Sequence, residues 1–141
     1  MNTRLALALA ATLGLALPAY SQAATAATTQ SAQQANPFFA ESPLPLHYPQ
    51  FDKIKDADFA PAFDAGMAQQ LQEVEAIANN PAAPTFENTL IALENSGAVL
   101  DRATTVFFSL IGADTNDARK KLQGDYSAKF AAHSDAINLN G

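Results

Sequence analysis

The stretch "PTFENTLIALENSGAVLDRATTVFFSLIG", residues 84–112, decides the fold of this chain. Its apolar and small residues recur at alternating steps of four and three, which is the period of one helix face. This seam consists of Phe86, Leu90, Leu93, Gly97, Leu100, Thr104, Phe107 and Ile111. A second seam beside it contains Ala92, Val99, Ala103, Val106 and Leu110. We therefore expect one helix from Phe86 to Ile111, about 39 Å long at about 1.5 Å per residue, with neighbours on two sides.

The ends of this helix are marked by capping residues. The hydroxyl of Thr85 can accept from the free amides of the first turn, and the carboxylate of Glu87 meets the positive end of the helix dipole. Asn88 stands where a capping box has Glu or Gln, so we expect only a partial box. Gly112 predicts the C-terminal stop.

A second amphipathic helix is predicted before this one. Its apolar stripe consists of Phe59, Phe63, Met67, Leu71, Val74 and Ile77. Proline is tolerated in an opening turn, so we expect the regular helix to begin near Pro61. The segment "NNPAAP", residues 79–84, ends the helix.

A third helix is predicted after "DTNDARKKL", with Asp114 or Thr115 as its cap. Its stripe continues through Leu122, Tyr126, Phe130, His133 and Ile137. We expect His133 to be a half-buried, hydrogen-bonded side chain rather than a ligand. The fold class is therefore all-α, built from long amphipathic helices over residues 56–141.

Residues 1–23 have the pattern of a secretory signal peptide. Arg4 precedes an apolar run from Leu5 to Leu17, and Pro18 and small residues follow. The run spans roughly 20 Å, which is short of a bilayer core, so we expect no stable membrane anchor. Cleavage is expected after Ala23, with Ala24 and Ala26 as close alternatives, which predicts a periplasmic protein.

Two further segments separate the signal peptide from the helices. Residues 24–36 are Ala, Thr, Gln and Ser without periodicity, which predicts a disordered spacer. Residues 37–55 contain four prolines among many apolar side chains, which predicts an extended Pro-rich strap on a protein surface.

Charge argues against a nucleic-acid partner. The chain carries 8 Lys and Arg against 14 Asp and Glu, a net charge of -6. A protein that binds nucleic acid needs a basic stripe to displace counterions from the phosphates. The one dense basic cluster, residues 119–121, lies among aspartates and indicates a solvated helix face.

No set of residues in the sequence forms a catalytic or metal-binding motif. Glu87 and Glu94 are seven residues apart on the predicted helix, about 10.5 Å along its axis, which is too far to share a proton or a metal. The two histidines, His47 and His133, do not form the HExxH pattern of a zinc hydrolase. There is no cysteine, no G-x-S-x-G and no P-loop. We therefore expect no catalytic, cofactor-binding or metal-binding residue in this chain.

The segment "FDKIKDADFAPAFDAGMAQQLQEVEAIANNPAAPTFENTLIALENSGAVLDRATTVFFSLIGADTND", residues 51–117, resembles a known family. It is similar to the N-terminal helical region of the thimet-oligopeptidase-like zinc metallopeptidases. The pieces "PTFENT" and "VFFSLIGADTND" carry the likeness, and the second favours the bacterial peptidyl-dipeptidases, also called dipeptidyl carboxypeptidases.

The resemblance implies a longer, all-helical enzyme that encloses a channel. In the family, zinc is held by HExxH and a further glutamate, and the zinc-bound water attacks the peptide carbonyl. Those positions have no counterpart here, so the zinc ligands are expected outside this chain. The implied partners are oligopeptide substrates, from which C-terminal dipeptides are released, and the remainder of the peptidase chain. Residues 56–141 would then be an incomplete domain that forms part of the channel wall.

Two hypotheses follow. The chain is the N-terminal fragment of an exported zinc peptidase, or it is a stand-alone exported helical binding protein without enzymatic activity. A fragment should expose one face of its second helix, whereas a complete domain should cover that face.

Overall fold

The computed structural model describes residues 36–139, and every regular element in that range is helical. The expectation of an all-α fold is confirmed. The predicted signal peptide, residues 1–23, and the predicted spacer, apart from Asn36, lie outside the described residues. The elements are η1 (Pro37–Phe39), η2 (Pro45–His47), α2 (Asp56–Ala78), η3 (Phe86–Ile91), α3 (Ala92–Glu94), α4 (Ala98–Ala113) and α5 (Asp117–Asn138).

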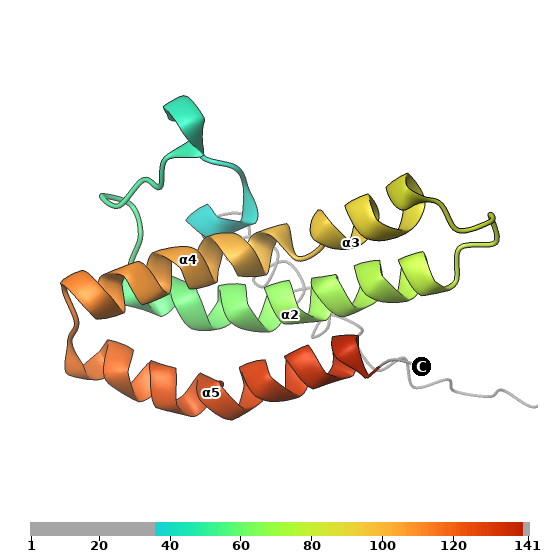
Figure 1. The fold of residues 1–141 in the computed structure, drawn as a ribbon. Helices are drawn as coiled ribbons and strands as arrows, with labels where there is room; N and C mark the ends of the chain where they lie inside the picture. Colours follow the sequence, from blue (N-terminus) through green and yellow to red (C-terminus); the bar gives the residue numbers. More distant parts are fainter. Residues whose placement is uncertain (1–35, 140–141) are drawn as a thin grey trace, which may run out of the picture.

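The helices are arranged around α2, which lies between α4 and α5 in Figure 1. The segment η3–α3 returns along the second half of α2, and α4 continues along the first half. Helix α5 runs in the same direction as α2 and ends near η3–α3. The chain before α2 lies over α4, with η1 in contact with both α2 and α4.

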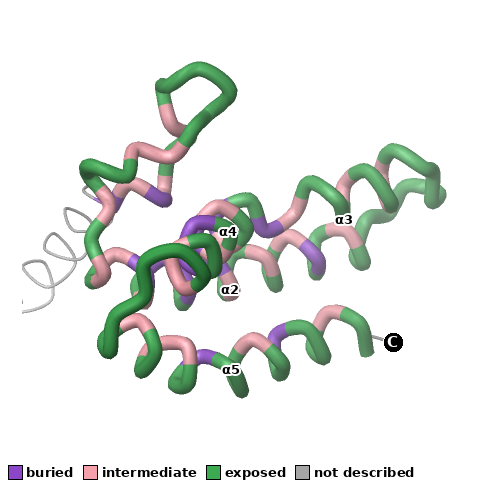
Figure 2. The backbone as a smooth tube through the Cα atoms, turned by 60° about the vertical axis from the view of Figure 1, so that its left-hand side comes forward, coloured by how far each residue is buried: buried purple, intermediate pink, exposed green. Residues whose placement is uncertain are grey.

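The core occupies the half of the molecule where α2, α4, α5 and η1 meet. Three phenylalanines are fully buried there, namely Phe59, Phe63 and Phe107. The ring of Phe63 has four aromatic neighbours, each with its centroid at 5.1 to 6.0 Å. Figure 2 shows buried backbone positions gathered in this half, whereas the η3–α3 end is mostly exposed or intermediate. The core therefore covers only part of the predicted apolar stripes.

Helix α2 begins earlier than predicted. It starts at Asp56, and Pro61 lies inside it rather than in its opening turn. The amide N–H of Lys55 donates to the carboxylate of Asp58 at 2.7 Å, which caps the first turn upstream of the proline. Pro61 is exposed, and its missing N–H removes only the bond to the carbonyl four residues earlier.

The prediction of one continuous helix from Phe86 to Ile111 is wrong, because the helix is broken between α3 and α4. The first six residues form a π-helix, and α3 ends before a turn at residues 95–97. Gly97 adopts a φ of 74°, a left-handed conformation that glycine adopts without strain. Its amide N–H donates to the carboxylate of Glu73 on α2 at 2.7 Å. The break is therefore held in place by α2.

The caps differ in detail from the predictions. Thr85 is confirmed as the N-cap, since its hydroxyl accepts from the Asn88 amide at 3.1 Å. The box is complete rather than partial, because the Asn88 side-chain oxygen accepts from the Thr85 amide at 2.7 Å. Helix α4 ends at Ala113, one residue beyond the predicted stop. Helix α5 is capped by Asn116, not by Asp114 or Thr115, because its side-chain oxygen accepts from the Arg119 amide at 2.8 Å.

The Pro-rich strap, residues 37–55, is not extended throughout. It contains the two single-turn helices η1 and η2, each opened by a proline whose fixed φ suits a first turn. Its anchor is Phe38, which is buried, and whose carbonyl accepts two bonds from the Arg102 guanidinium at 3.1 and 3.2 Å. The rest is less tightly docked than expected, since Leu44, Leu46 and Tyr48 are exposed.

Candidate functional site

His133 is the centre of a polar junction between three segments of the chain. Its Nε2 lies 2.7 Å from the side-chain oxygen of Gln70 on α2. The Gln70 amide group also donates to the hydroxyl of Ser96, in the turn before α4, at 3.4 Å. Since a carboxamide oxygen only accepts, Nε2 of His133 carries the proton of this bond. The prediction of a hydrogen-bonded histidine is confirmed, but His133 is buried rather than half-buried, with 9% of its surface exposed.

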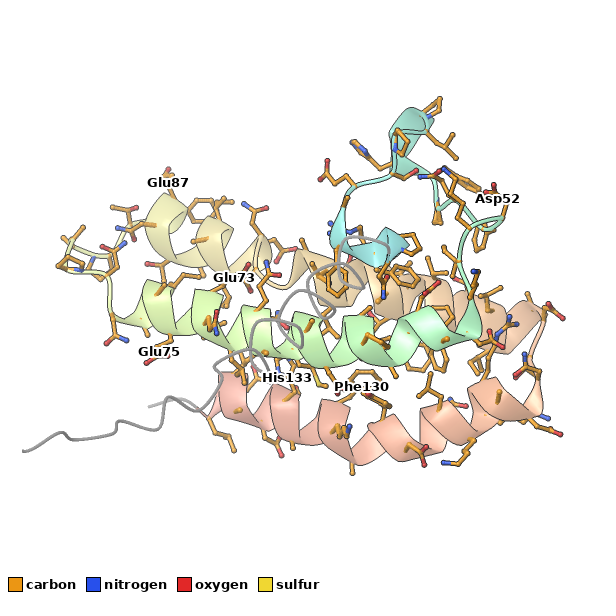
Figure 3. The ribbon with its side chains drawn as sticks, turned by 180° about the vertical axis from the view of Figure 1, so that it is seen from behind. Asp52, Glu73, Glu75, Glu87, Phe130 and His133 are labelled. Carbon is orange, nitrogen blue, oxygen red and sulfur yellow. The ribbon has the colours of Figure 1, made fainter. Side chains whose placement is uncertain are left out.

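A groove of about 610 Å³ lies next to this junction. Its apolar lining comes from Leu100, Phe108 and Phe130, and its polar lining includes Gln70, Ser96 and His133. Figure 3 shows His133 and Phe130 directed from α5 towards α2. The groove can hold a small group by packing and hydrogen bonding, but it lacks a nucleophile paired with a base. The junction joins α2, α5 and the turn before α4.

The junction makes stability depend on pH. Burial lowers the pKa of His133 below its ordinary value of 6.5. Below pH 6.5 the unfolded chain therefore binds a proton more readily than the folded chain, and stability falls as the pH drops towards the folded-state pKa.

We expect His133→Gln to reduce this loss of stability. The measurement is the free energy of unfolding from urea titrations at pH 7.5 and pH 5.5. The wild-type chain should lose stability between these values, and the variant should lose less, because glutamine does not titrate. Equal losses in the two chains would show that other groups, such as the carboxylates, carry the whole pH dependence.

Sequence reasoning missed Gln70 although a signal for it was present. Phe63, Met67, Gln70 and Val74 follow one another at steps of four, three and four, so the glutamine occupies a position on the stripe that faces the core. A polar residue at such a position needs a buried partner. His133 supplies that partner.

Glu87 and Glu94 do not form a joint site. Glu87 lies in the first turn of η3, as predicted for a residue that meets the dipole, and its side chain points outward in Figure 3. Glu94 lies on α3 and lines the groove beside the junction. Both residues are exposed, and within residues 36–139 neither forms an ion pair.

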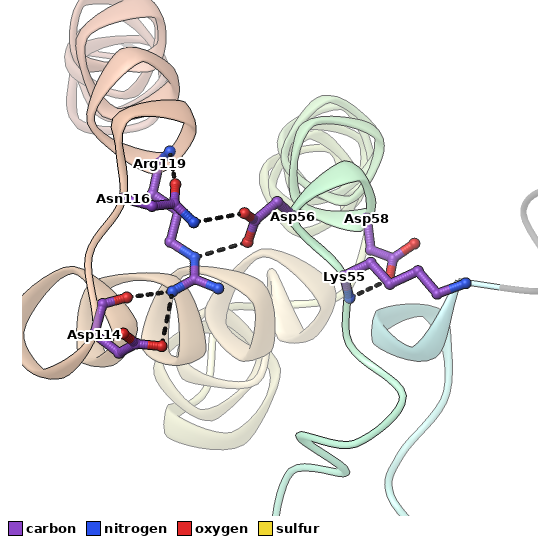
Figure 4. A network of polar contacts seen from close by, with 6 residues as sticks. All are labelled: Lys55, Asp56, Asp58, Asp114, Asn116 and Arg119. Atoms are coloured by element: carbon purple, nitrogen blue, oxygen red, sulfur yellow. Dashed lines mark hydrogen bonds and ion pairs between the residues drawn. The ribbon is translucent and has the colours of Figure 1, made fainter.

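A second polar network links the start of α2, the start of α5 and the turn between α4 and α5 (Figure 4). The Arg119 Nε donates to the carboxylate of Asp56 at 2.7 Å, and the Asn116 amide donates to the same carboxylate at 2.9 Å. These hydrogen bonds, first that of Asn116 and then that of Arg119, lower the pKa of Asp56. Arg119 also contacts Asp114 in the turn between α4 and α5. The basic cluster is thus solvated only in part, because Arg119 joins three segments whereas Lys120 and Lys121 are exposed.

The described residues do not fit the zinc that the resemblance implies. Among residues 36–139 no group of three or more His, Cys, Asp or Glu side chains could hold a metal ion. His47 lies in the exposed strap with Nδ1 3.1 Å from the Ser42 carbonyl, and Nε2 of His133 is bonded to Gln70.

None of the described helices combines the length and apolar character needed to cross a bilayer.

Comparison with known proteins identifies two similar enzymes. Over 105 residues, 74% of this chain, the sequence is 52% identical to a dipeptidyl carboxypeptidase of Salmonella typhimurium. Over 106 residues, 75% of this chain, it is 47% identical to a dipeptidyl carboxypeptidase of Escherichia coli. These matches cover 15% and 16% of the two relatives, so the chain spans only a small part of their length. No protein-family model matches the chain. The resemblance to the peptidyl-dipeptidases is confirmed at this level.

Proposed function

We propose that this chain is the N-terminal part of an exported zinc metallopeptidase that releases dipeptides from the C-terminus of oligopeptides. The observation that carries the proposal is the identity of 47–52% to two dipeptidyl carboxypeptidases over three quarters of the chain. Those relatives are several times longer than the matched segment, so most of such an enzyme would lie outside this sequence.

The exposed apolar side chains support the fragment hypothesis over a complete binding domain. On η3 and α3, the side chains of Phe86, Leu90, Ile91 and Leu93 are between 41% and 61% exposed. A run of large apolar residues on one end of a helical protein is typical of a surface that another part of the protein covers.

The contribution of this segment would be structural. Helices α2, α4 and α5 would form part of the wall of the peptide channel, held by the Phe63 core and the polar networks at His133 and Arg119. The zinc, its ligands and the general base would come from the remainder of the chain. When bound there, zinc would activate a water molecule for attack on the peptide carbonyl.

The test begins with the reading frame downstream of Gly141. If the frame continues, the longer chain is purified and mixed with an N-acetylated peptide, and the products are identified by mass spectrometry. We expect dipeptides from the C-terminus, loss of activity with a chelator and no product from the 141-residue chain. Hydrolysis by the 141-residue chain would contradict the proposal that the catalytic residues lie outside it. An inactive longer chain would favour the binding-protein hypothesis.

Export is a separate prediction. Expressed in a Gram-negative bacterium, the protein should be recovered from the periplasm with Ala24 as its N-terminal residue, because Ser21 and Ala23 offer small side chains to the signal peptidase. N-terminal mass spectrometry of the periplasmic fraction measures this. Changing Ala23 to a bulky residue should leave the precursor uncut or move cleavage. An intact Met1 in the wild-type product would rule the signal peptide out.

A further inference from the structure

A groove of about 930 Å³, lined by both apolar and polar side chains, lies at the end of the molecule away from the aromatic core. Its floor is the last part of α2, with Leu71, Val74 and Ile77. One wall is formed by Thr89 and Leu93 of the η3–α3 segment. The other wall is formed by the last residues of α5, 136–138. The groove is thus a channel between two helical ridges, the shape that receives a further helix.

The parts of α2, η3–α3 and α5 that border this groove carry carboxylates but no Lys or Arg. There is no Lys or Arg between Asp56 and Asp101, and none after Lys129. The carboxylates of this end are Glu73, Glu75, Glu87, Glu94 and Asp135. Figure 3 shows Glu73, Glu75 and Glu87 in the half of the molecule away from Asp52. A group bound in the groove would therefore contact apolar side chains on its floor and would have carboxylates around it.

We propose that this groove is filled by a helix from the part of the same polypeptide that follows Gly141, with an apolar stripe flanked by Lys and Arg. The inference rests on the proposed function, because it requires the chain to continue. It goes further in assigning the place and the chemistry of one contact between this segment and the remainder of the enzyme.

Two observations favour an occupant from the same chain, and the charge of the groove argues against a second copy. The matched relatives leave about 85% of their length for segments that this sequence does not contain, as the 15% coverage implies. Helix α5 ends at Asn138, which itself lines the groove, and Leu139 beyond it is 79% exposed. A continuing chain would leave α5 beside the groove and could enter it with a short connection. A second copy that bound through the same face would bring the same carboxylates to the contact, and the like charges would repel.

Thiol labelling tests this directly, because the 141-residue chain has no cysteine. Leu93→Cys places a probe in the groove wall, and Ala118→Cys places a control in the first turn of α5, at its other end. The rate of reaction with a maleimide is measured in the 141-residue chain and in the longer chain, each relative to the same variant unfolded in urea. Native cysteines of the longer chain, if present, are first replaced by serine.

We expect Leu93→Cys to react freely in the 141-residue chain and at least about tenfold more slowly in the longer chain, because a docked helix must open before the thiol can react. The Ala118→Cys control, at an exposed position, should react freely in both chains and shows that the reagent is active. Equal rates at Leu93→Cys in the two chains would overturn the proposal. So would protection in the 141-residue chain that disappears on dilution, because the occupant would then be a second copy, and so would a stop codon directly after Gly141.

The charge of the occupant has its own readout. Glu75→Lys reverses one charge at the groove, whereas Asp52→Lys makes the same change on the strap, remote from it. Combined with Leu93→Cys in the longer chain, Glu75→Lys should speed labelling several-fold and Asp52→Lys should not. Equal labelling rates in the Glu75→Lys and Asp52→Lys variants would refute the proposal that the docked helix carries Lys and Arg beside its apolar stripe. Dipeptide release is measured in parallel: an active enzyme with an unprotected groove refutes this inference alone, and an inactive chain with a protected groove refutes the proposed function alone.

Discussion

Phe63→Ala should lower the free energy of unfolding by about 3–5 kcal/mol, the usual cost of removing a fully buried phenylalanine ring. Phe63 has no exposed surface, and its ring contacts Phe59 on its own helix, Phe107 on α4, and Tyr126 and Phe130 on α5. Its loss opens a cavity where three helices meet, and the surrounding rings cannot all collapse into it. Urea titration followed by far-UV circular dichroism measures the change.

Phe86→Ala is the matched control for this substitution. It removes the same atoms from a side chain that is 61% exposed on η3. In the 141-residue chain we expect a loss below about 1 kcal/mol, because little buried area is removed. A comparable loss for the two variants would mean that the aromatic cluster is not the principal core.

Gly66→Ala should cost about 1–3 kcal/mol, the range for overpacking a close contact. A Cβ at Gly66 would lie 2.8 Å from the backbone nitrogen of Leu100 and 2.9 Å from its Cα. Those atoms belong to the backbone of α4, so relief requires α2 and α4 to move apart rather than one side chain to turn. The loss should appear as a lower urea midpoint.

Gly124→Ala serves as the opposite control. It lies within α5, and a Cβ there would meet no atom within 4 Å. Alanine at an open helical position is expected to stabilise by about 0.4–1 kcal/mol. The two glycines should thus respond with opposite signs. A stabilising Gly66→Ala would show that the helices do not approach as closely as the structure indicates.

The stripe periodicity predicted where the long helices lie and which residues form the core. Phe59, Phe63 and Phe107 were all on predicted stripes, and all are fully buried. The break at residues 95–97 escaped notice because Leu93 and Leu100 keep a spacing of seven across it. The spacing of apolar residues cannot reveal a turn when the residues on its two sides keep the spacing of an unbroken helix. The contact that holds the turn, from Gly97 to Glu73, joins two helices and has no local signature in the sequence.

The polar junctions were the least predictable features. His133 was expected to have a partner, but Gln70 and Ser96 lie in other segments, and only packing brings them together. Likewise, the capping role of Asn116 competes with those of Asp114 and Thr115, which are also good cap residues, and the bonds to Asp56 favour it. The strap was predicted to be extended, but it contains η1 and η2. Proline fixes φ at a value that is compatible with both an extended chain and the first turn of a helix.

The close approach of Gly66 to Leu100 also bears on the order in which the protein folds. It joins α2 to α4 across the η3–α3 segment, a shorter separation along the chain than that between α2 and α5, so this pairing closes the shorter loop and can form earlier. Helix α5 would dock on that pair, because Tyr126 and Phe130 pack on the ring of Phe63, which also contacts Phe107 of α4. During synthesis, the α2–α4 hairpin would become able to close once Ala113 has left the ribosome, and α5 would dock on it afterwards.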